Sequence, residues 1–105
     1  MKRYEVSFLA EAIADLDRLF IYIAEKSSYE IADGYLARIE RLCLSLRSLP
    51  QRGTAVAGDV PGLRTMGFEH RVTIQFRVGE ERAEILRILY GGRDLGPQLE
   101  GLSET

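Results

Sequence analysis

The chain has 105 residues, of which 46% are hydrophobic and 29% are charged, and its formal net charge at pH 7 is −2. This length fits one domain, and this composition is typical of a folded protein and not of a disordered chain. The net negative charge argues against a general nucleic-acid binder, because such proteins gain most of their affinity by neutralising phosphates.

The sequence has no run of 18 apolar residues, so we expect no transmembrane helix and no membrane partner. The basic N-terminus does not continue as a signal peptide, since Glu11, Asp15 and Asp17 interrupt the apolar residues too early. The protein is therefore expected to be cytoplasmic. Cys43 is the single cysteine, which excludes an intramolecular disulfide, and its apolar neighbours predict a packed, inert thiol.

The first part of the chain predicts a strand and then a helix. Tyr4, Val6 and Phe8 alternate with polar residues, which indicates a half-buried strand over residues 2–8. Apolar residues then recur at helical spacing and form a stripe. The stripe consists of Ala10, Ile13, Leu16, Leu19 or Phe20, Ile23 and Ala24. The charged residues expected to lie off this stripe are Glu11, Asp15, Arg18 and Glu25.

A second helix is predicted to begin at a capping box. In this pattern Ser27 accepts a hydrogen bond from the backbone of Glu30, whose side chain reaches back. One face of the helix is apolar and consists of Ile31, Tyr35, Ile39, Leu42 and Leu46. Pro50 ends it, and the short connection between the two helices predicts an antiparallel helical hairpin.

The second half of the chain predicts three strands. Residues 51–61 contain two glycines and a proline and are expected to form a loop. A short strand at 63–66 precedes an alternating strand at 71–78, a tight turn at 79–81 and a strand at 82–90. In the last strand, one face consists of Leu86, Ile88 and Tyr90, and the other contains Ile85 and Leu89. We therefore expect a central strand that is covered on both sides.

The predicted element order is β-α-α-β-β-β. This order describes an α+β domain in which a helical hairpin packs on a small antiparallel sheet. Residues 1–94 are expected to form this single domain, and residues 95–105 a polar C-terminal tail.

Several short strings occur in a characteristic order along the chain. They are residues 12–16 and 22–24, Leu49-Pro50 with Gly53, Gly62-Leu63-Arg64, Arg71, residues 76–78 and 85–90, and Gly92-Arg93-Asp94. In their order and spacing these strings are similar to the ParE branch of the ParE/RelE superfamily of bacterial toxins. The chain therefore resembles a ParE-type toxin over about residues 3–94.

The resemblance implies a toxin of a type II toxin–antitoxin pair. ParE toxins inhibit DNA gyrase by binding, whereas RelE toxins cleave mRNA on the ribosome. For this chain the ParE branch implies a hetero-oligomer with a ParD-like, ribbon-helix-helix antitoxin, contact with operator DNA only through that antitoxin, and gyrase as the target. It implies no cofactor and no metal. The region after the last strand, with Arg93, Asp94 and Leu95, is implied to bind the target.

Cleavage of RNA requires a base, a cation that holds the phosphate and an acid for the leaving oxygen. The resemblance places Arg71 and Arg93 at RelE-type arginine positions, but Leu99 occupies the position of the RelE tyrosine and cannot transfer a proton. A nuclease site would therefore consist of Arg71, Tyr90 and Arg93, with His70 beside them. Tyr90 is interpreted first as a core aromatic, so we favour a toxin that is not an enzyme.

A RelE-like, ribosome-dependent mRNA endoribonuclease remains the alternative, and a decayed toxin that only co-represses its operon is a third. In the ParE interpretation, apolar residues of the antitoxin fill a groove beside the helical hairpin and the sheet.

Arginines are expected to bind antitoxin carboxylates, because a guanidinium pairs with a carboxylate in a bidentate manner. The candidates are Arg64, Arg71, Arg77 and Arg93. The alternative partners within the chain are Glu69, Glu80 and Glu84. For Arg77 and Arg82, which flank the turn at Gly79, we favour pairing within the chain.

Overall fold

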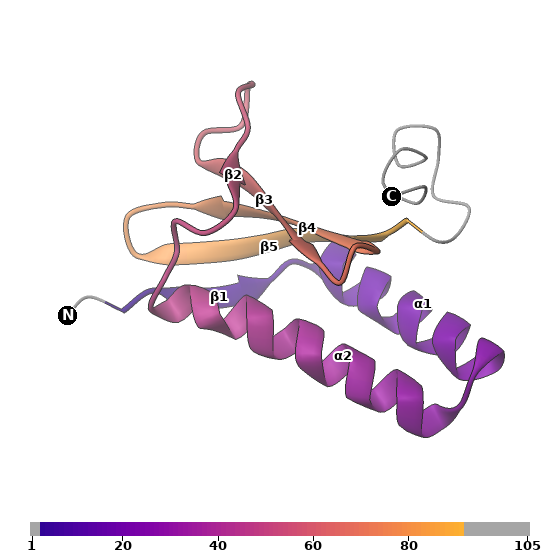
Figure 1. Ribbon diagram of the computed structural model, residues 1–105. Coiled ribbons are helices and arrows are strands. Elements are labelled where there is room, and N and C mark those ends of the chain that lie inside the picture. Colours follow the sequence, from indigo (N-terminus) through magenta and orange to yellow (C-terminus); the bar gives the residue numbers. More distant parts are fainter. Residues whose placement is uncertain (1–2, 92–105) are drawn as a thin grey trace.

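The computed structural model describes residues 3–91, which form two long helices and a five-stranded sheet (Figure 1). The elements are β1 (Glu5–Phe8), α1 (Ala10–Lys26), α2 (Tyr29–Leu44), the 3₁₀ turn η1 (Ser45–Arg47), β2 (Thr54–Ala55), β3 (Leu63–Phe68), β4 (Val72–Val78) and β5 (Arg82–Tyr90). The predicted α+β fold is confirmed. Neither helix is long and apolar enough to cross a membrane, as judged within residues 3–91.

The strand order is β1-β5-β4-β3-β2, so the last strand in sequence is the second in the sheet. β1 pairs with β5 in parallel, whereas every other pair is antiparallel. The sheet is therefore mixed, and the expectation of a purely antiparallel sheet was wrong for β1. The segment 51–61, expected to be a loop, contributes the short edge strand β2.

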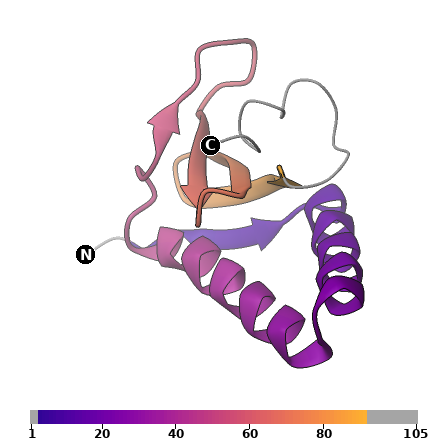
Figure 2. The same ribbon diagram turned by 45° about the vertical axis from the view of Figure 1, so that its right-hand side comes forward.

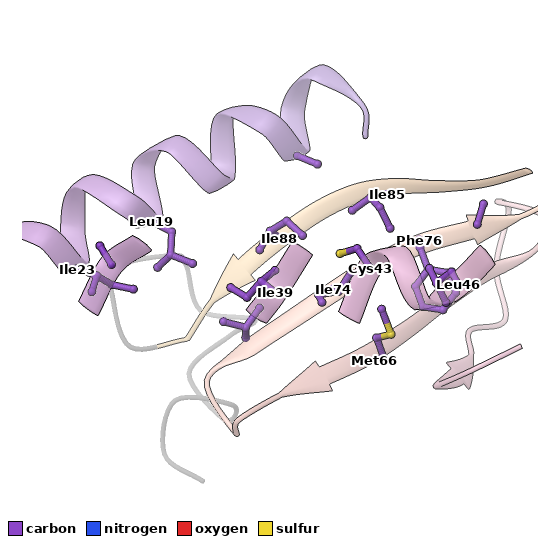
Figure 3. Packing of buried hydrophobic residues seen from close by; sticks show 14 residues of the cluster. Leu19, Ile23, Ile39, Cys43, Leu46, Met66, Ile74, Phe76, Ile85 and Ile88 are labelled. Atoms are coloured by element: carbon purple, nitrogen blue, oxygen red, sulfur yellow. The ribbon is translucent and has the colours of Figure 1, made fainter. Parts of the chain in front are cut away.

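Both helices lie on the same face of the sheet (Figure 1). They meet at the turn after α1 and diverge towards their other ends (Figure 2). Side chains from both helices and from β3, β4 and β5 fill the space between the two layers, as Figure 3 shows for Leu19, Ile39, Phe76 and Ile85. Cys43 lies in this core, and burial raises the pKa of its thiol to about 12, which agrees with the predicted inert thiol.

A β-bulge in β5 changes which residues face the helices. Gln75 pairs with Arg87, but the next residue, Phe76, pairs with Ile85, so Leu86 is the extra residue. An extra residue reverses the alternation of faces beyond it. Ile85 and Ile88 are consequently both buried in the core. The prediction that Leu86 shares a face with Ile88 was wrong, because strict alternation cannot anticipate a bulge.

The second helix begins one residue later than the capping box predicted. Ser28 is its N-cap, and the Ser28 hydroxyl accepts a hydrogen bond from the backbone N–H of Ile31 at 3.1 Å. Ser27 instead ends α1. The Ile31 side chain is exposed, although the sequence placed it on the buried face.

Asp15 joins α1 to the edge of β5. β1 ends beside Ile85, so the backbone N–H of Ile88 has no strand partner on that side. The Asp15 carboxylate accepts this N–H at 2.9 Å and also accepts the Nε of Arg87 at 2.8 Å. Arg18, one turn further along α1, donates to the same carboxylate at 2.7 Å.

The sequence placed Asp15 off the apolar stripe, yet only 6% of the residue is exposed. That expectation was wrong because the partners of Asp15 lie on a strand about 70 residues later. Burial alone would raise the pKa of Asp15. The hydrogen bonds from Arg87 and Ile88, together with the charge of Arg87, have the larger effect, so the pKa of Asp15 is lowered. The carboxylate is therefore ionised and holds the helix against the strand.

We predict that Asp15→Asn lowers the free energy of unfolding at pH 7 by about 2 kcal/mol, because removing one member of a buried charged network leaves the others without compensation. The depressed pKa of Asp15 contributes stability above the unfolded pKa of about 3.9, and this contribution is lost as the pH falls through the lower folded pKa. Urea unfolding measured from pH 7 to pH 3 should show the difference between wild type and variant shrinking.

Asp17→Asn is the matched control, because Asp17 lies on the same helix and is exposed. Equal losses of stability in the two variants would contradict the assigned role of Asp15.

Candidate functional site

α1 and α2 diverge from the turn that joins them (Figure 2). A hollow of about 400 Å³ is lined by residues of both helices, and we call it the helical groove. Its lining residues are Phe8, Ile13, Leu16, Asp17, Phe20, Leu36 and Glu40. Five of these side chains are apolar, and the remaining two are acidic. A contiguous exposed apolar surface with a charged border is typical of a protein-binding site.

Ile13 shows that this groove is open to solvent. The sequence placed Ile13 in the buried stripe of α1, yet 49% of it is exposed. That expectation was wrong because α2 diverges from α1 (Figure 2), and about half of the Ile13 surface stays exposed to solvent. Ile21, on another part of α1, is similarly exposed at 56% but does not line the groove.

A second hollow, of about 470 Å³, lies where the turn between the helices approaches the end of the sheet, and we call it the tyrosine pocket. Its lining residues are Tyr22, Ile23, Lys26, Ser27, Ile31, Tyr35, Glu69, Arg71 and Tyr90. The rings of Tyr22 and Tyr90 contact each other with centroids 5.6 Å apart. The pocket therefore combines aromatic walls with charged groups of both signs.

The turn between β3 and β4 forms one border of the tyrosine pocket. Residues 69–71 connect the two strands, and the first two, Glu69 and His70, have φ angles of 51° and 63°, a left-handed conformation that disfavours residues other than glycine. Glu69 nevertheless makes a bidentate pair with Arg38 of α2, at 3.0 and 3.2 Å. The Arg38 guanidinium also lies over the rings of Tyr35 and Phe68, at 5.3 and 5.9 Å. The turn is thus fixed to α2.

Three of the four candidate arginines for antitoxin carboxylates lie within the described residues. Arg64 donates to the backbone carbonyls of Arg52 at 2.8 Å and Gln51 at 2.9 Å, and more weakly to that of Gly53. Its guanidinium therefore holds the loop after η1 in place.

Arg77 pairs with Glu84 on the neighbouring strand, which agrees with the interpretation favoured for it. Arg82 also pairs within the chain, but with Glu5 of β1 at 3.1 Å. Arg71, in contrast, is exposed, and its guanidinium makes no ion pair or hydrogen bond with any residue of the described chain. Among the three candidates that the structure describes, Arg71 is therefore the one whose charge is available to a partner.

Arg93, Asp94 and Leu95, predicted to bind the target, and Leu99 lie outside the described residues. Of the alternative nuclease residues, Arg71 and Tyr90 both line the tyrosine pocket, whereas His70 is exposed on the turn. Tyr90 packs against Tyr22 on the helix side of the sheet, as expected for a partly buried aromatic residue.

The carboxylate that lines the tyrosine pocket is Glu69, and Arg38 holds both of its oxygens. Burial, together with the nearby Tyr90 and Glu69, raises the pKa of Tyr35 to about 12. The Tyr35 hydroxyl therefore stays protonated and can donate a hydrogen bond. Within residues 3–91, no three histidine, cysteine, aspartate or glutamate side chains are grouped as a metal site requires.

Sequence reasoning predicted a groove beside the helical hairpin and the sheet but did not name the residues that line it, and it missed most of the tyrosine pocket. The pairs Tyr22–Lys26 and Ile31–Tyr35 are each four residues apart and therefore share a helix face, on either side of the predicted turn. That spacing was a usable signal for the pocket. The groove had no such signal, because it depends on the angle between the helices.

Comparison with known proteins connects this architecture to a family. The family model described as the ParE toxin of the type II toxin–antitoxin system parDE matches residues 6–95. The chain belongs to the ParE toxin family. A ParE relative, Toxin ParE3 of Caulobacter vibrioides (strain ATCC 19089 / CIP 103742 / CB 15), is 35% identical over 85 residues, which cover 81% of this chain and 84% of that protein.

Two solved structures share the ParE fold of this chain. A chain of the chromosomal ParDE toxin–antitoxin system from P. aeruginosa superposes with a TM-score of 0.72 at 26% identity, covering 84% of this chain and 96% of that one. A chain of the toxin–antitoxin complex RelBE2 from Mycobacterium tuberculosis gives a TM-score of 0.60 at 20% identity, covering 86% and 93%. The second similarity shows the shared fold alone.

The different environments of the arginines lead to a stability prediction. Arg64→Ala should lower the free energy of unfolding by about 1 kcal/mol, because it removes the donors to the carbonyls of the loop. Arg71→Ala should change it by less than about 0.5 kcal/mol, as expected at an exposed position without partners. Urea denaturation monitored by circular dichroism measures both, and a larger loss for Arg71→Ala would show that Arg71 has a structural role.

Proposed function

We propose that this ParE-family toxin inhibits DNA gyrase by binding it and is neutralised by a ParD-like, ribbon-helix-helix antitoxin. The observation that carries the proposal is the open, apolar helical groove in a chain that belongs to the ParE family. The similarity to a chain of a ParDE system supports an antitoxin as the partner. In this proposal the toxin acts in the cytoplasm and reaches operator DNA only through the antitoxin.

Apolar residues of an antitoxin helix would occupy the helical groove. Phe8, Leu16 and Phe20 line it, and Ile13 exposes half of its surface there. An amphipathic helix that lies in such a groove buries apolar area on both partners, which is the main source of affinity in this mode of recognition. Asp17 and Glu40 at the border favour basic residues on the sides of the bound helix.

Inhibition by binding, and not by catalysis, is supported by the chemistry of the tyrosine pocket. Arg71 could hold a phosphate there, but the carboxylate of Glu69 is engaged by Arg38 and is poorly placed to accept a proton. Burial raises the pKa of Tyr35 to about 12, so at neutral pH its hydroxyl is protonated and no phenolate is available to accept a proton. These side chains are better suited to recognition than to proton transfer.

The first test is enzymatic. The purified toxin should inhibit supercoiling of relaxed plasmid by gyrase, and addition of the antitoxin encoded beside it should restore supercoiling. The same preparation should leave ribosome-bound mRNA intact. Unaffected gyrase together with cleaved mRNA would overturn the proposal in favour of the RelE-like ribonuclease.

The second test concerns the groove. Ile13→Glu should weaken antitoxin binding by about 100-fold in isothermal titration calorimetry, because it places a charge in an apolar contact between two acidic residues. Ile21→Glu, at a similarly exposed position of the same helix but outside the groove, should bind like wild type. Equal affinities for the two variants would exclude the groove as the docking site.

The RelE-like ribonuclease remains the second candidate because Arg71 and Tyr90 line the same hollow. Tyr90→Phe separates the two candidates, since it removes only the hydroxyl. If mRNA cleavage is present in wild type and lost in this variant, the catalytic interpretation is supported.

A further inference from the structure

We propose that the tyrosine pocket is a second docking site, separate from the helical groove, for an acidic segment of the antitoxin that carries an apolar side chain next to a carboxylate. This inference rests on the proposed function, because it assumes that an antitoxin binds the chain. It adds a site and a ligand chemistry that the groove does not provide.

The first argument is the charge at the pocket. Arg71 and Lys26 both line it, and neither has a carboxylate partner within residues 3–91. Glu69 also lines it, but Arg38 neutralises that charge with a bidentate pair. The pocket therefore has an excess of positive charge in a protein whose net charge is −2. A carboxylate bound there would gain charge-assisted hydrogen bonds from Arg71.

The second argument is the apolar and aromatic lining. The rings of Tyr22, Tyr35 and Tyr90 form walls, and Ile31 lies beside them with 58% of its surface exposed. A hollow of about 470 Å³ is within the size range of sites that enclose small ligands. An apolar side chain placed there would cover surface that now contacts water. The protonated hydroxyl of Tyr35 adds a hydrogen-bond donor for the neighbouring carboxylate.

The third argument is that the side chains of the pocket are preorganised before any ligand binds. The edge-to-face contact of Tyr35 with Phe68, at 5.4 Å, and the position of Arg38 over both rings join α2 to β3. Glu69 has a positive φ angle, which is unfavourable for this residue type, and its pair with Arg38 holds it in that conformation. Side chains held in this way lose little freedom when a ligand binds, which favours affinity.

An acidic peptide fits these observations better than a nucleic acid. Affinity for single-stranded nucleic acid requires several cations along the backbone path, and this pocket has two cations and a carboxylate. The helical groove is bordered by Asp17 and Glu40, whereas the pocket is bordered by Arg71 and Lys26. We therefore expect the antitoxin to be basic along the segment in the groove and acidic along the segment that reaches the pocket.

The experiment measures binding of the antitoxin encoded beside the toxin. Arg71→Glu should weaken binding by about 10- to 100-fold in calorimetry, because it replaces an attraction with a repulsion. Arg41→Glu makes the same charge change at an exposed position on α2 that does not line the pocket, and it should bind like wild type. The melting temperatures of both variants establish that they are folded.

A charge swap identifies the antitoxin residue. Each aspartate and glutamate of the antitoxin is changed in turn to lysine, and one of these variants should restore binding to Arg71→Glu while weakening binding to wild type. Tyr35→Phe, which keeps the ring and removes the donor, should weaken binding of the wild-type antitoxin by about 3- to 10-fold.

The outcomes separate the two proposals. If wild-type toxin and antitoxin do not bind, the proposed function fails. If they bind and Arg71→Glu binds equally well, or if no charge swap restores its binding, the tyrosine pocket is not a docking site, while the proposed function stands. If a fluorescein-labelled oligouridine binds wild type and not Arg71→Glu, the pocket is a nucleic-acid site and the peptide assignment is overturned.

Discussion

The contact of the Asp15 carboxylate with the edge of β5 determines how the two layers of this protein meet. β1 pairs with only the first half of β5. Beyond it, the backbone groups of β5 on this side face α1, whose own backbone groups are already used within the helix. Asp15 accepts the N–H of Ile88 and the Arg87 side chain, so a helix takes the place of a missing strand. This side chain positions α1 on the sheet together with the buried apolar residues Ala12, Leu19 and Ile23.

Because α1 is fixed to β5 while α2 packs across the core, the two helices meet at one end and diverge at the other. Two hollows of opposite character result from this arrangement. The helical groove is apolar with acidic residues at its border. The tyrosine pocket is aromatic, and its two cations, Arg71 and Lys26, have no carboxylate partner within residues 3–91. The architecture thus gives a partner two points of contact that differ in charge, and simultaneous contact at two linked sites strengthens binding.

The sequence predicted the order of the helices and of the longer strands, because the spacing of apolar residues differs between a helix and a strand that each bury one face. It missed the bulge at Leu86, the burial of Asp15 and the exposure of Ile13 and Ile31. Each of these depends on contacts between segments that are distant in the sequence. Arg71 was named as a candidate together with Arg64 and Arg77. Pairing of Arg77 within the chain was expected from the sequence, but only the structure shows that Arg64 is also occupied within the chain.

The parallel pairing of β1 with β5 has a consequence for synthesis. Glu5 pairs with Arg82, so β1 can join the sheet only after β5 has been synthesised. β5 also lies between β1 and β4, and therefore no nascent chain that lacks it contains a continuous sheet. Folding that depends on such distant pairs is slow compared with helix formation. The sheet of the described residues is consequently complete only after β5 has been synthesised, so surfaces that include β5 form later than those of the two helices.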